Sequence, residues 1–390
     1  MNKKTFFVLV ATMFISMLGM GIVTPFLPAY ARELNASNLQ IGLVQSAFSI
    51  TGIFTLLFVG RLSDKFGRKI FLVIGLGILA LSSLGLMYAK TPEMLILMRL
   101  VQGLGASAHL PIAQAYLGDI TPEGNEGKWM GYFNAIMFAG IGAGPLLGGV
   151  LADNFSIPTT FMVMAVMNAL GLIAVMIYLK EMPRKVATRT EHNSVWAPLR
   201  SRVMDGVMVQ RTMTGVGTSV MMAFLPIVAE ERLGLSLTLI GVLMALRTPV
   251  SLLQSFTGRL ADRWNRRWMV VDGSLIAMVG LAVLPFTGGF WTLAAAYFAL
   301  TVGQSVAMPA ANAYVVEEGR TYGMGLCMTY FTMAMQVGNS VGAVALGYVG
   351  DLVGLDWTFY LAAFFLFASS VLFFFIVRKK DSPRIIRTVV

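Results

Sequence analysis

Charged residues are scarce in this sequence. They make up 12% of its 390 residues, whereas a typical soluble domain carries about 25%. Hydrophobic residues make up 57%, and the mean hydropathy is +0.75, which excludes an ordinary soluble protein. The net charge of +10 raises the question of nucleic acid, but no basic segment is interleaved with aromatic residues on a polar background. We therefore expect no nucleic-acid partner and interpret the basic residues as membrane anchors.

Residues that build metal, redox and catalytic centres are also few. The single cysteine, Cys327, excludes a disulfide framework, and the two histidines, His109 and His192, are far apart in the sequence. No phosphate-binding loop of the form G-x-x-x-x-G-K-[ST] is present, so the chain has no visible means of hydrolysing ATP. No paired acids or activated nucleophile are visible either. We predict no enzyme activity, no cofactor and no metal site.

Twelve apolar stretches are long enough to cross a bilayer, whose hydrocarbon core requires about 20 residues per helix. The first is longer than the core of a signal peptide, about 7–15 residues, and is interpreted as a retained span. The stretches are residues 6–30, 39–59, 70–88, 94–117, 129–151, 160–179, 207–229, 239–256, 269–286, 290–316, 324–349 and 358–377.

The distribution of lysine and arginine predicts the orientation of these spans. With residue 1 on the cytoplasmic side, the cytoplasmic segments hold 23 basic residues and the opposite loops hold three. Basic residues accumulate on the cytoplasmic side of a membrane, so we expect both termini to be cytoplasmic, in the cell membrane.

The sequence repeats itself at a separation of 198 positions. Phe26-Leu27-Pro28 matches Phe224-Leu225-Pro226, and residues 60–68 match residues 258–266 in glycine, arginine and aspartate. Apolar composition alone would not align these residue types. Each repeat holds six spans, an even number, so both share one orientation. We predict an N-terminal six-helix bundle over 1–180, a cytoplasmic linker over 181–204, and a C-terminal bundle with a short tail over 205–390.

The loop after the second stretch carries the most specific motif. It reads Gly60-Arg61-Leu62-Ser63-Asp64-Lys65-Phe66-Gly67-Arg68-Lys69 and is echoed by residues 258–267. This duplicated segment resembles the cytoplasmic loop signature of the major facilitator superfamily. The resemblance implies an all-α integral membrane protein with twelve transmembrane helices in two pseudo-symmetric six-helix bundles.

The resemblance also implies conformational latches at this loop. Asp64 would approach the positive N-terminus of the eleventh span, near Met324, and the repeat would place Asp262 near Trp129 in the same way. Two ion pairs follow, Arg68–Asp119 and Arg266–Glu317, and together the contacts would favour the inward-closed state. The expected latch residues are Gly60, Asp64, Arg68, Asp119, Gly258, Asp262, Arg266 and Glu317.

The fifth span contains a glycine-rich run, residues 140–149. It is similar to the motif associated with exporters among the drug/proton antiporters, through Gly140, Gly144, Pro145, Gly148 and Gly149. Small residues let helices pack closely, and Pro145 removes a backbone hydrogen bond. The first span, from Leu18 to Pro28, and the group Arg99, Gln102 and Gly103 are similar to signatures of the same twelve-helix family.

Three arginines fall within spans, where a charge costs about 2.5–3.5 kcal/mol on insertion scales and usually faces a cavity or a partner. Arg99 and Arg247 are our candidates for substrate contacts, whereas Arg211 is interpreted as a side chain that reaches the interface. Such a cavity would be electropositive and suit neutral or anionic amphipathic compounds. Other candidates for cavity-lining groups are Gln45, Asn134, Gln304 and Gln336.

The first span lacks the carboxylate that many members of this family use for proton coupling. His109, near the middle of the fourth span, could carry a proton instead, although a neutral core histidine is the commoner case. We predict a monomeric secondary transporter that exports small amphipathic compounds, with protons as the coupling ion and the lipid bilayer as its environment. The alternative is a proton-independent facilitator or uptake transporter for a neutral or anionic metabolite.

Overall fold

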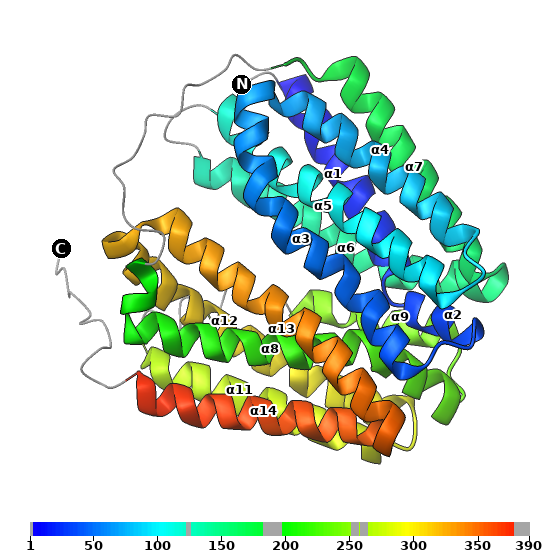
Figure 1. The fold of residues 1–390 in the computed structure, drawn as a ribbon, viewed down its shortest axis with the longest axis vertical. Helices are drawn as coiled ribbons and strands as arrows, with labels where there is room; N and C mark the ends of the chain where they lie inside the picture. The colour runs from blue at the N-terminus through cyan, green and yellow to red at the C-terminus, as the bar shows by residue number, and fades with distance from the viewer. Residues whose placement is uncertain (1–2, 122–125, 182–196, 251–256, 258–263, 378–390) are drawn as a thin grey trace. The chain divides into compact units, whose positions relative to one another are not determined.

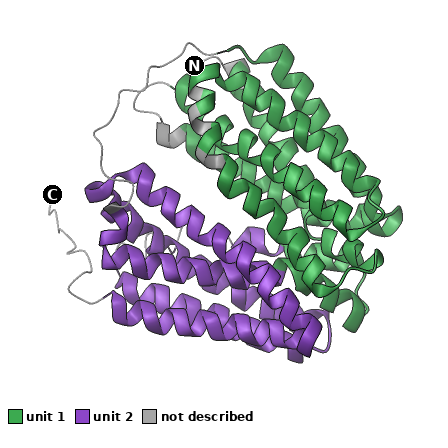
Figure 2. Cartoon of the chain, viewed as in Figure 1, with its two compact units in different colours: residues 1–189, 222–245 green, residues 190–221, 246–390 purple. Residues whose placement is uncertain are grey.

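The computed structural model describes residues 3–121, 126–181, 197–250, 257 and 264–377. The described residues are almost entirely helical and contain no strand (Figure 1). They form two compact units, unit 1 with residues 1–189 and 222–245, and unit 2 with residues 190–221 and 246–390 (Figure 2). The prediction of an all-α fold is confirmed.

Unit 1 contains the first six long helices together with the end of α8 and the start of the eighth span. Its helices are α1 (Lys3–Val23), α2 (Leu27–Glu33), α3 (Asn38–Phe66), α4 (Arg68–Met87), α5 (Pro92–Ile120), α6 (Glu126–Asn154), α7 (Ile157–Tyr178), η2 (Val228–Arg232) and α9 (Leu237–Ala245). The α4 and α7 helices lie side by side (Figure 1).

Unit 2 contains most of α8 and the last four long helices. Its elements are η1 (Ala197–Arg200), α8 (Arg202–Ile227) as far as Met221, α11 (Arg266–Val283), η3 (Leu284–Phe286), α12 (Phe290–Tyr322), α13 (Met324–Val353) and α14 (Leu355–Ile376). Here α11 and α14 lie side by side (Figure 1).

The helices account for the twelve predicted spans. Nine segments of the described chain are long and apolar enough to cross a membrane, and α1 and α2 together form the first of them. The α3 and α13 helices, of 29 and 30 residues, match two further stretches. The apolar helix Leu237–Val250 begins the remaining one, whose second half lies outside the described residues.

The turn between α3 and α4 depends on a glycine. Gly67 has a φ of 104°, a conformation that side chains disfavour. A Cβ atom on Gly67 would also lie 2.6 Å from the carboxylate carbon of Glu181. That carboxylate accepts a hydrogen bond from the backbone N–H of Lys69, at 3.2 Å, in the first turn of α4. The positive φ therefore favours glycine at this turn, and Glu181 connects the start of α4 to the segment that follows α7.

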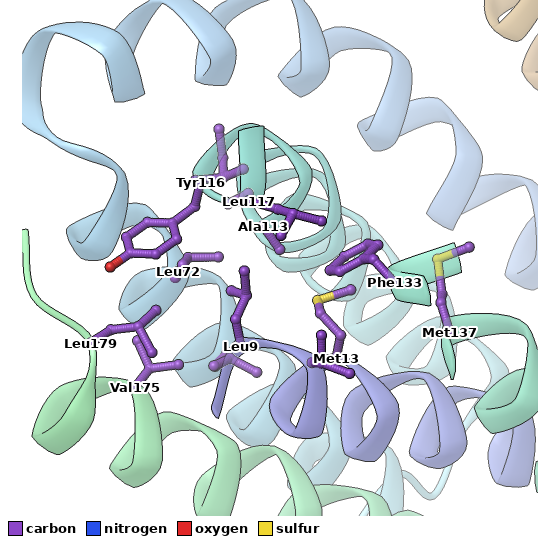
Figure 3. Packing of buried hydrophobic residues seen from close by; sticks show 14 of the residues in the cluster. Leu9, Met13, Leu72, Ala113, Tyr116, Leu117, Phe133, Met137, Val175 and Leu179 are labelled. Atoms are coloured by element: carbon purple, nitrogen blue, oxygen red, sulfur yellow. The ribbon is translucent and has the colours of Figure 1, made fainter. Parts of the chain in front are cut away.

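Five helices of unit 1 share one buried core. Leu9 of α1, Leu72 of α4, Tyr116 of α5, Phe133 of α6 and Val175 of α7 are each no more than 1% exposed (Figure 3). The hydroxyl of the tyrosine donates to the carbonyl of Lys180 at 2.8 Å, which satisfies its one polar group.

Unit 2 builds its core from the equivalent positions. Val207, Val270, Tyr314, Phe331 and Phe373 are buried in one cluster contributed by α8, α11, α12, α13 and α14. Each lies 198 positions after its counterpart in the unit 1 core, the separation at which the sequence repeats. The internal repeat is therefore a repeat of tertiary packing, and not only of loop motifs.

The compact units follow packing rather than order along the chain, because α9 packs against α6 and joins unit 1. The expected division into 1–180, 181–204 and 205–390 stays a prediction, and residues 182–196 of that linker lie outside the described residues.

Candidate functional site

Each unit contains one ion pair, and the two pairs join equivalent helices of their own unit. In unit 1, Nε of Arg68 at the start of α4 contacts Oδ2 of Asp119 near the end of α5. In unit 2, an Nη atom of Arg266 at the start of α11 lies 3.3 Å from Oε2 of Glu317 near the end of α12. The family resemblance, carried to both halves by the sequence repeat, implies both pairings, and both contacts are present. Their role as conformational latches stays a prediction.

The other latch candidates are described only in part. Gly60 and Asp64 lie in the last two turns of α3, but the surroundings of Gly60 and the side chain of Asp64 are outside the described part of the structure. Gly258 and Asp262 are outside the described residues altogether. The predicted contacts of Asp64 and Asp262 with helix N-termini therefore stay predictions.

The glycine-rich run of α6 packs directly on the backbone of α1. A Cβ atom on Gly144 would lie 2.5 Å from the Cα of Gly21, and one on Gly148 would lie 2.3 Å from the carbonyl oxygen of Ile22. A Cβ atom on Gly140 would lie 2.8 Å from the carbonyl oxygen of Phe14. Real Cβ atoms essentially never come this close to backbone, so the run admits no larger residue at these positions.

A second face of the same run packs on α9. A Cβ atom on Gly149 would lie 2.5 Å from the carbonyl oxygen of Leu237, and one on Gly241 of α9 would lie 2.2 Å from that of Pro145. The α6 helix of unit 1 is thus in near-backbone contact with two helices, α1 and α9. The sequence predicts close packing at this run but does not identify either neighbour.

Asp153, in the last turn of α6, completes this contact. Its carboxylate accepts hydrogen bonds from the backbone N–H groups of Leu237, at 3.0 Å, and Thr238, at 2.7 Å. These are free N–H groups of the first turn of α9, and an aspartate there is a favourable cap. Sequence reasoning missed this role, although the repeat itself aligns Asp153 with Asp351.

Arg99 is buried in unit 1, with 2% of its surface exposed. Its Nε donates to the carbonyl of Val44 at 3.3 Å, and an Nη atom donates to Oε1 of Gln102 at 2.7 Å. Its guanidinium also stacks over the ring of Phe48, 4.5 Å from the centroid. These partners within the unit favour a packing role for Arg99, and the predicted substrate contact stays untested.

His109 is also buried in α5, with 1% of its surface exposed. Neither ring nitrogen has a hydrogen-bond partner among the described residues. A charged imidazolium here would be an uncompensated buried charge, which is costly, so this state of the protein suits the neutral ring. Its predicted part in proton transfer stays a prediction.

Arg211 and Arg247 both belong to unit 2, on α8 and on the Leu237–Val250 helix. Arg247 is exposed, and its charge acts on that of Arg211. Arg211 is partly buried and stacks over the ring of Phe331, 4.5 Å from the centroid. The sequence analysis proposed Arg247 and Arg99 together as substrate contacts. Within unit 2, the arginine near Arg247 is Arg211.

The remaining polar candidates are partly buried. In unit 2, Gln304 donates to Thr218 at 3.4 Å, and Gln336 accepts from Asn339 at 3.4 Å. Gln45 and Asn134 are partly buried in unit 1. Over the described part of the chain, no group of three or more His, Cys, Asp or Glu side chains could hold a metal ion.

Long apolar helices in two equivalent cores, glycine-lined helix contacts and arginines within spans are features of a polytopic membrane transporter. A family model described as "Major Facilitator Superfamily" matches residues 9–246 and 207–388, and the chain belongs to this superfamily. Its members are membrane transporters of small molecules rather than enzymes, and the chain is a multi-pass membrane protein.

Similar proteins cover almost the whole chain. An uncharacterized MFS-type transporter of Methanocaldococcus jannaschii is 28% identical over 93% of this chain and 95% of its own. Multidrug resistance protein 1 of Bacillus subtilis is 27% identical, over 93% and 94%. Quinolone resistance protein NorA of Staphylococcus aureus is 25% identical, over 93% of each chain.

Solved structures share the fold at lower identity. The nucleoside transporter NupG superposes with a TM-score of 0.81 at 14% identity, over 97% of this chain and 100% of its own. A bacterial homolog of the lysosomal transporter Spinster, in an inward-facing and unoccupied conformation, gives 0.84 at 14% identity, over 98% and 99%. The predicted major facilitator fold is confirmed.

Proposed function

We propose that this transporter exports small amphipathic organic compounds by alternating access, driven by proton antiport. The observation that carries the proposal is the glycine-rich run of α6, which resembles the exporter motif and lies in near-backbone contact with both α1 and α9. Two relatives that match the chain almost end to end are named for multidrug and quinolone resistance. The absence of a phosphate-binding loop supports an ion gradient as the source of energy.

The ion pairs would act as part of the conformational cycle. Arg68–Asp119 and Arg266–Glu317 each fix the start of one helix to the end of the next, so we propose that they stabilise one state of each unit. We also propose that both termini are cytoplasmic and that the protein works as a monomer in the cell membrane. The count of basic residues supports the orientation.

His109 is the proposed proton carrier. The first predicted span, residues 6–30, contains no carboxylate, so it offers no acid for the exchange of protons. A buried imidazole without a hydrogen-bond partner can accept a proton only when its surroundings change, as they would between two states of a transporter.

A proton-independent facilitator or uptake transporter is the second candidate, favoured by the same missing carboxylate. The discriminating experiment reconstitutes the full chain in liposomes with an imposed pH gradient. It follows ethidium as a cationic dye, Nile red as a neutral dye and carboxyfluorescein as an anionic dye. Accumulation that stops when an ionophore collapses the gradient supports antiport. Flux that is indifferent to the gradient supports the facilitator.

A matched pair of variants tests the export motif in the same liposomes. Gly144→Leu would separate α6 from α1, and we expect flux to fall at least tenfold. Gly131→Ala lies on the same helix, where a Cβ atom meets nothing within 4 Å, and should transport as the parent does. Equal flux through the two variants would contradict the role of the glycine-rich run.

A further inference from the structure

Arg211 differs from the other arginines that stack on aromatic rings. Arg99 lies over Phe48 and Arg267 lies over Phe374, and each donates to a backbone carbonyl of its own unit. Nε of Arg267 also lacks a partner, but an Nη atom of that guanidinium has its acceptor. Arg211 stacks on Phe331 in the same manner, but its buried Nε has no acceptor and the rest of its guanidinium has no hydrogen bond among the described residues. A buried guanidinium N–H normally has a partner, so this one has capacity for a further acceptor.

The internal repeat shows that packing does not require an arginine at this position. Counting back 198 positions, Arg211 corresponds to Met13 and Phe331 corresponds to Phe133. Met13 and Phe133 are both 1% exposed and belong to the same buried cluster of unit 1 (Figure 3). A methionine therefore fills the equivalent position in a core that also holds the equivalent phenylalanine, whereas unit 2 has an arginine there.

Arg247 is likewise a charged residue at a position where the first half of the sequence has an uncharged one. Its counterpart 198 positions earlier is Ser49, a buried and uncharged residue. Arg247 is exposed near the middle of an apolar segment and acts on Arg211 as a like charge. Among the described residues, no carboxylate forms an ion pair with either arginine. Two neighbouring cations at membrane depth without an acid are unfavourable unless an anion or water faces them.

We infer that Arg211 and Arg247 bind the anionic headgroup of the transported compound, a carboxylate or a sulfonate on an otherwise apolar molecule. Guanidinium groups suit such headgroups because their N–H donors match two acceptor oxygens. Phe331 contacts one guanidinium through its ring, 4.5 Å from the centroid, and supplies no acceptor for the N–H donors. The inference rests on the proposed function in that it names the substrate class of the exporter. It departs from the sequence-based interpretation, in which Arg211 reaches the interface.

Binding is tested first on the full chain in nanodiscs of phosphatidylcholine, by isothermal titration calorimetry. Naphthaleneacetate, naphthaleneacetamide and naphthylethylamine share one ring system and present an anionic, a neutral and a cationic headgroup. We expect the carboxylate to bind at least tenfold more tightly than the amide and the amine. Equal binding of the three probes, or no binding of the carboxylate, would overturn the inference.

The variants take the residues that unit 1 uses at equivalent positions. Arg211→Met and Arg247→Ser should each weaken the binding of naphthaleneacetate about tenfold, as expected for the loss of a charge-assisted hydrogen bond. The affinity for naphthaleneacetamide should not change. Arg211→Lys keeps the charge and should retain the preference for the anion. Arg202→Gln, at the exposed start of α8, is the matched control and should bind as the parent does. A preference for the anion that persists in the Arg211→Met/Arg247→Ser double variant would overturn the inference.

Two further comparisons separate this inference from the proposed function and from the binding of a lipid headgroup. If dye export fails in liposomes while the arginine-dependent preference remains, the proposed function fails and the anion site stands. If export proceeds but ignores both arginines, the site fails and the proposed function stands. Repeating the titration with phosphatidylglycerol in the nanodiscs addresses lipid headgroups. Loss of naphthaleneacetate binding there would assign the pair to a lipid and overturn the inference, whereas unchanged binding supports it.

Discussion

Asp153 and Thr238 are joined by a hydrogen bond of 2.7 Å, from the backbone N–H of Thr238 to Oδ2 of the aspartate. The other carboxylate oxygen accepts from the N–H of Leu237 at 3.0 Å. One side chain at the end of α6 thus satisfies two free N–H groups at the start of α9, a helix remote in the sequence. The contact lies beside Gly149, where a Cβ atom would lie 2.5 Å from the carbonyl oxygen of Leu237.

Removing this carboxylate should destabilise unit 1. We expect Asp153→Ala to cost about 1 kcal/mol, the usual loss for a helix cap, and Asp153→Asn to cost less because its amide oxygen can still accept. Thermal unfolding of the purified protein in detergent measures both. Asn154→Ala removes an exposed neighbour that bonds only to its own helix, at Val150, and serves as the control. A melting temperature of Asp153→Ala equal to that of the parent would argue against the cap.

Close packing of α6 on α1 predicts a sharp difference between two glycines of one helix. Gly144→Ala places a Cβ atom 2.5 Å from the backbone of α1, so we expect a loss of about 1–3 kcal/mol from overpacking. Gly131→Ala meets open space and should be neutral or stabilising by up to about 1 kcal/mol. Thermal unfolding of the two variants side by side checks this. Equal melting temperatures would mean that α1 and α6 can move apart without cost.

The ion pair between Arg68 and Asp119 should show measurable coupling. Both side chains are about one-fifth exposed, so water screens the pair only in part. We expect a coupling free energy of about 1 kcal/mol from the double-mutant cycle of Arg68→Gln and Asp119→Asn. Arg266→Gln and Glu317→Gln form the equivalent cycle in unit 2, where Glu317 is 40% exposed and the coupling should be smaller. Independent, additive losses in both cycles would show that the pairs do not stabilise the structure.

The unpartnered imidazole predicts that His109 can be replaced with a gain in stability. His109→Leu removes two buried nitrogens that have no hydrogen-bond partner in the described structure, and we expect stabilisation of about 1 kcal/mol. The same variant should lose the response of flux to a pH gradient if the ring carries protons. A lower melting temperature in His109→Leu would show that the ring nitrogens do have hydrogen-bond partners. Gradient-driven flux at the parental rate would exclude it as the carrier.

The sequence was most informative where residue type and spacing are repeated. The family resemblance implies the ion pair of Arg68 with Asp119, and the separation of 198 positions then implies the pair of Arg266 with Glu317. Helix ends are also set locally, as at Gly67, where the positive φ of 104° favours glycine. Asp153 was missed because an aspartate at the end of a span looks like an interfacial residue until its partner helix is known.

Hydropathy by itself determined the twelve spans, and the separation of 198 positions determined the two-fold repeat, because both are properties of the chain and not of its packing. The superfamily was indicated by the resemblance of the loop motif at residues 60–69 to a known signature. Only the tertiary structure decided how each helix is rotated. That rotation buries Arg99 against Val44 of α3, leaves Nε of Arg211 without an acceptor among the described residues, and brings α9 onto the glycines of α6. An apolar helix has little amphipathic pattern from which its rotation could be read, so these contacts depend on side chains that meet only after the helices have packed.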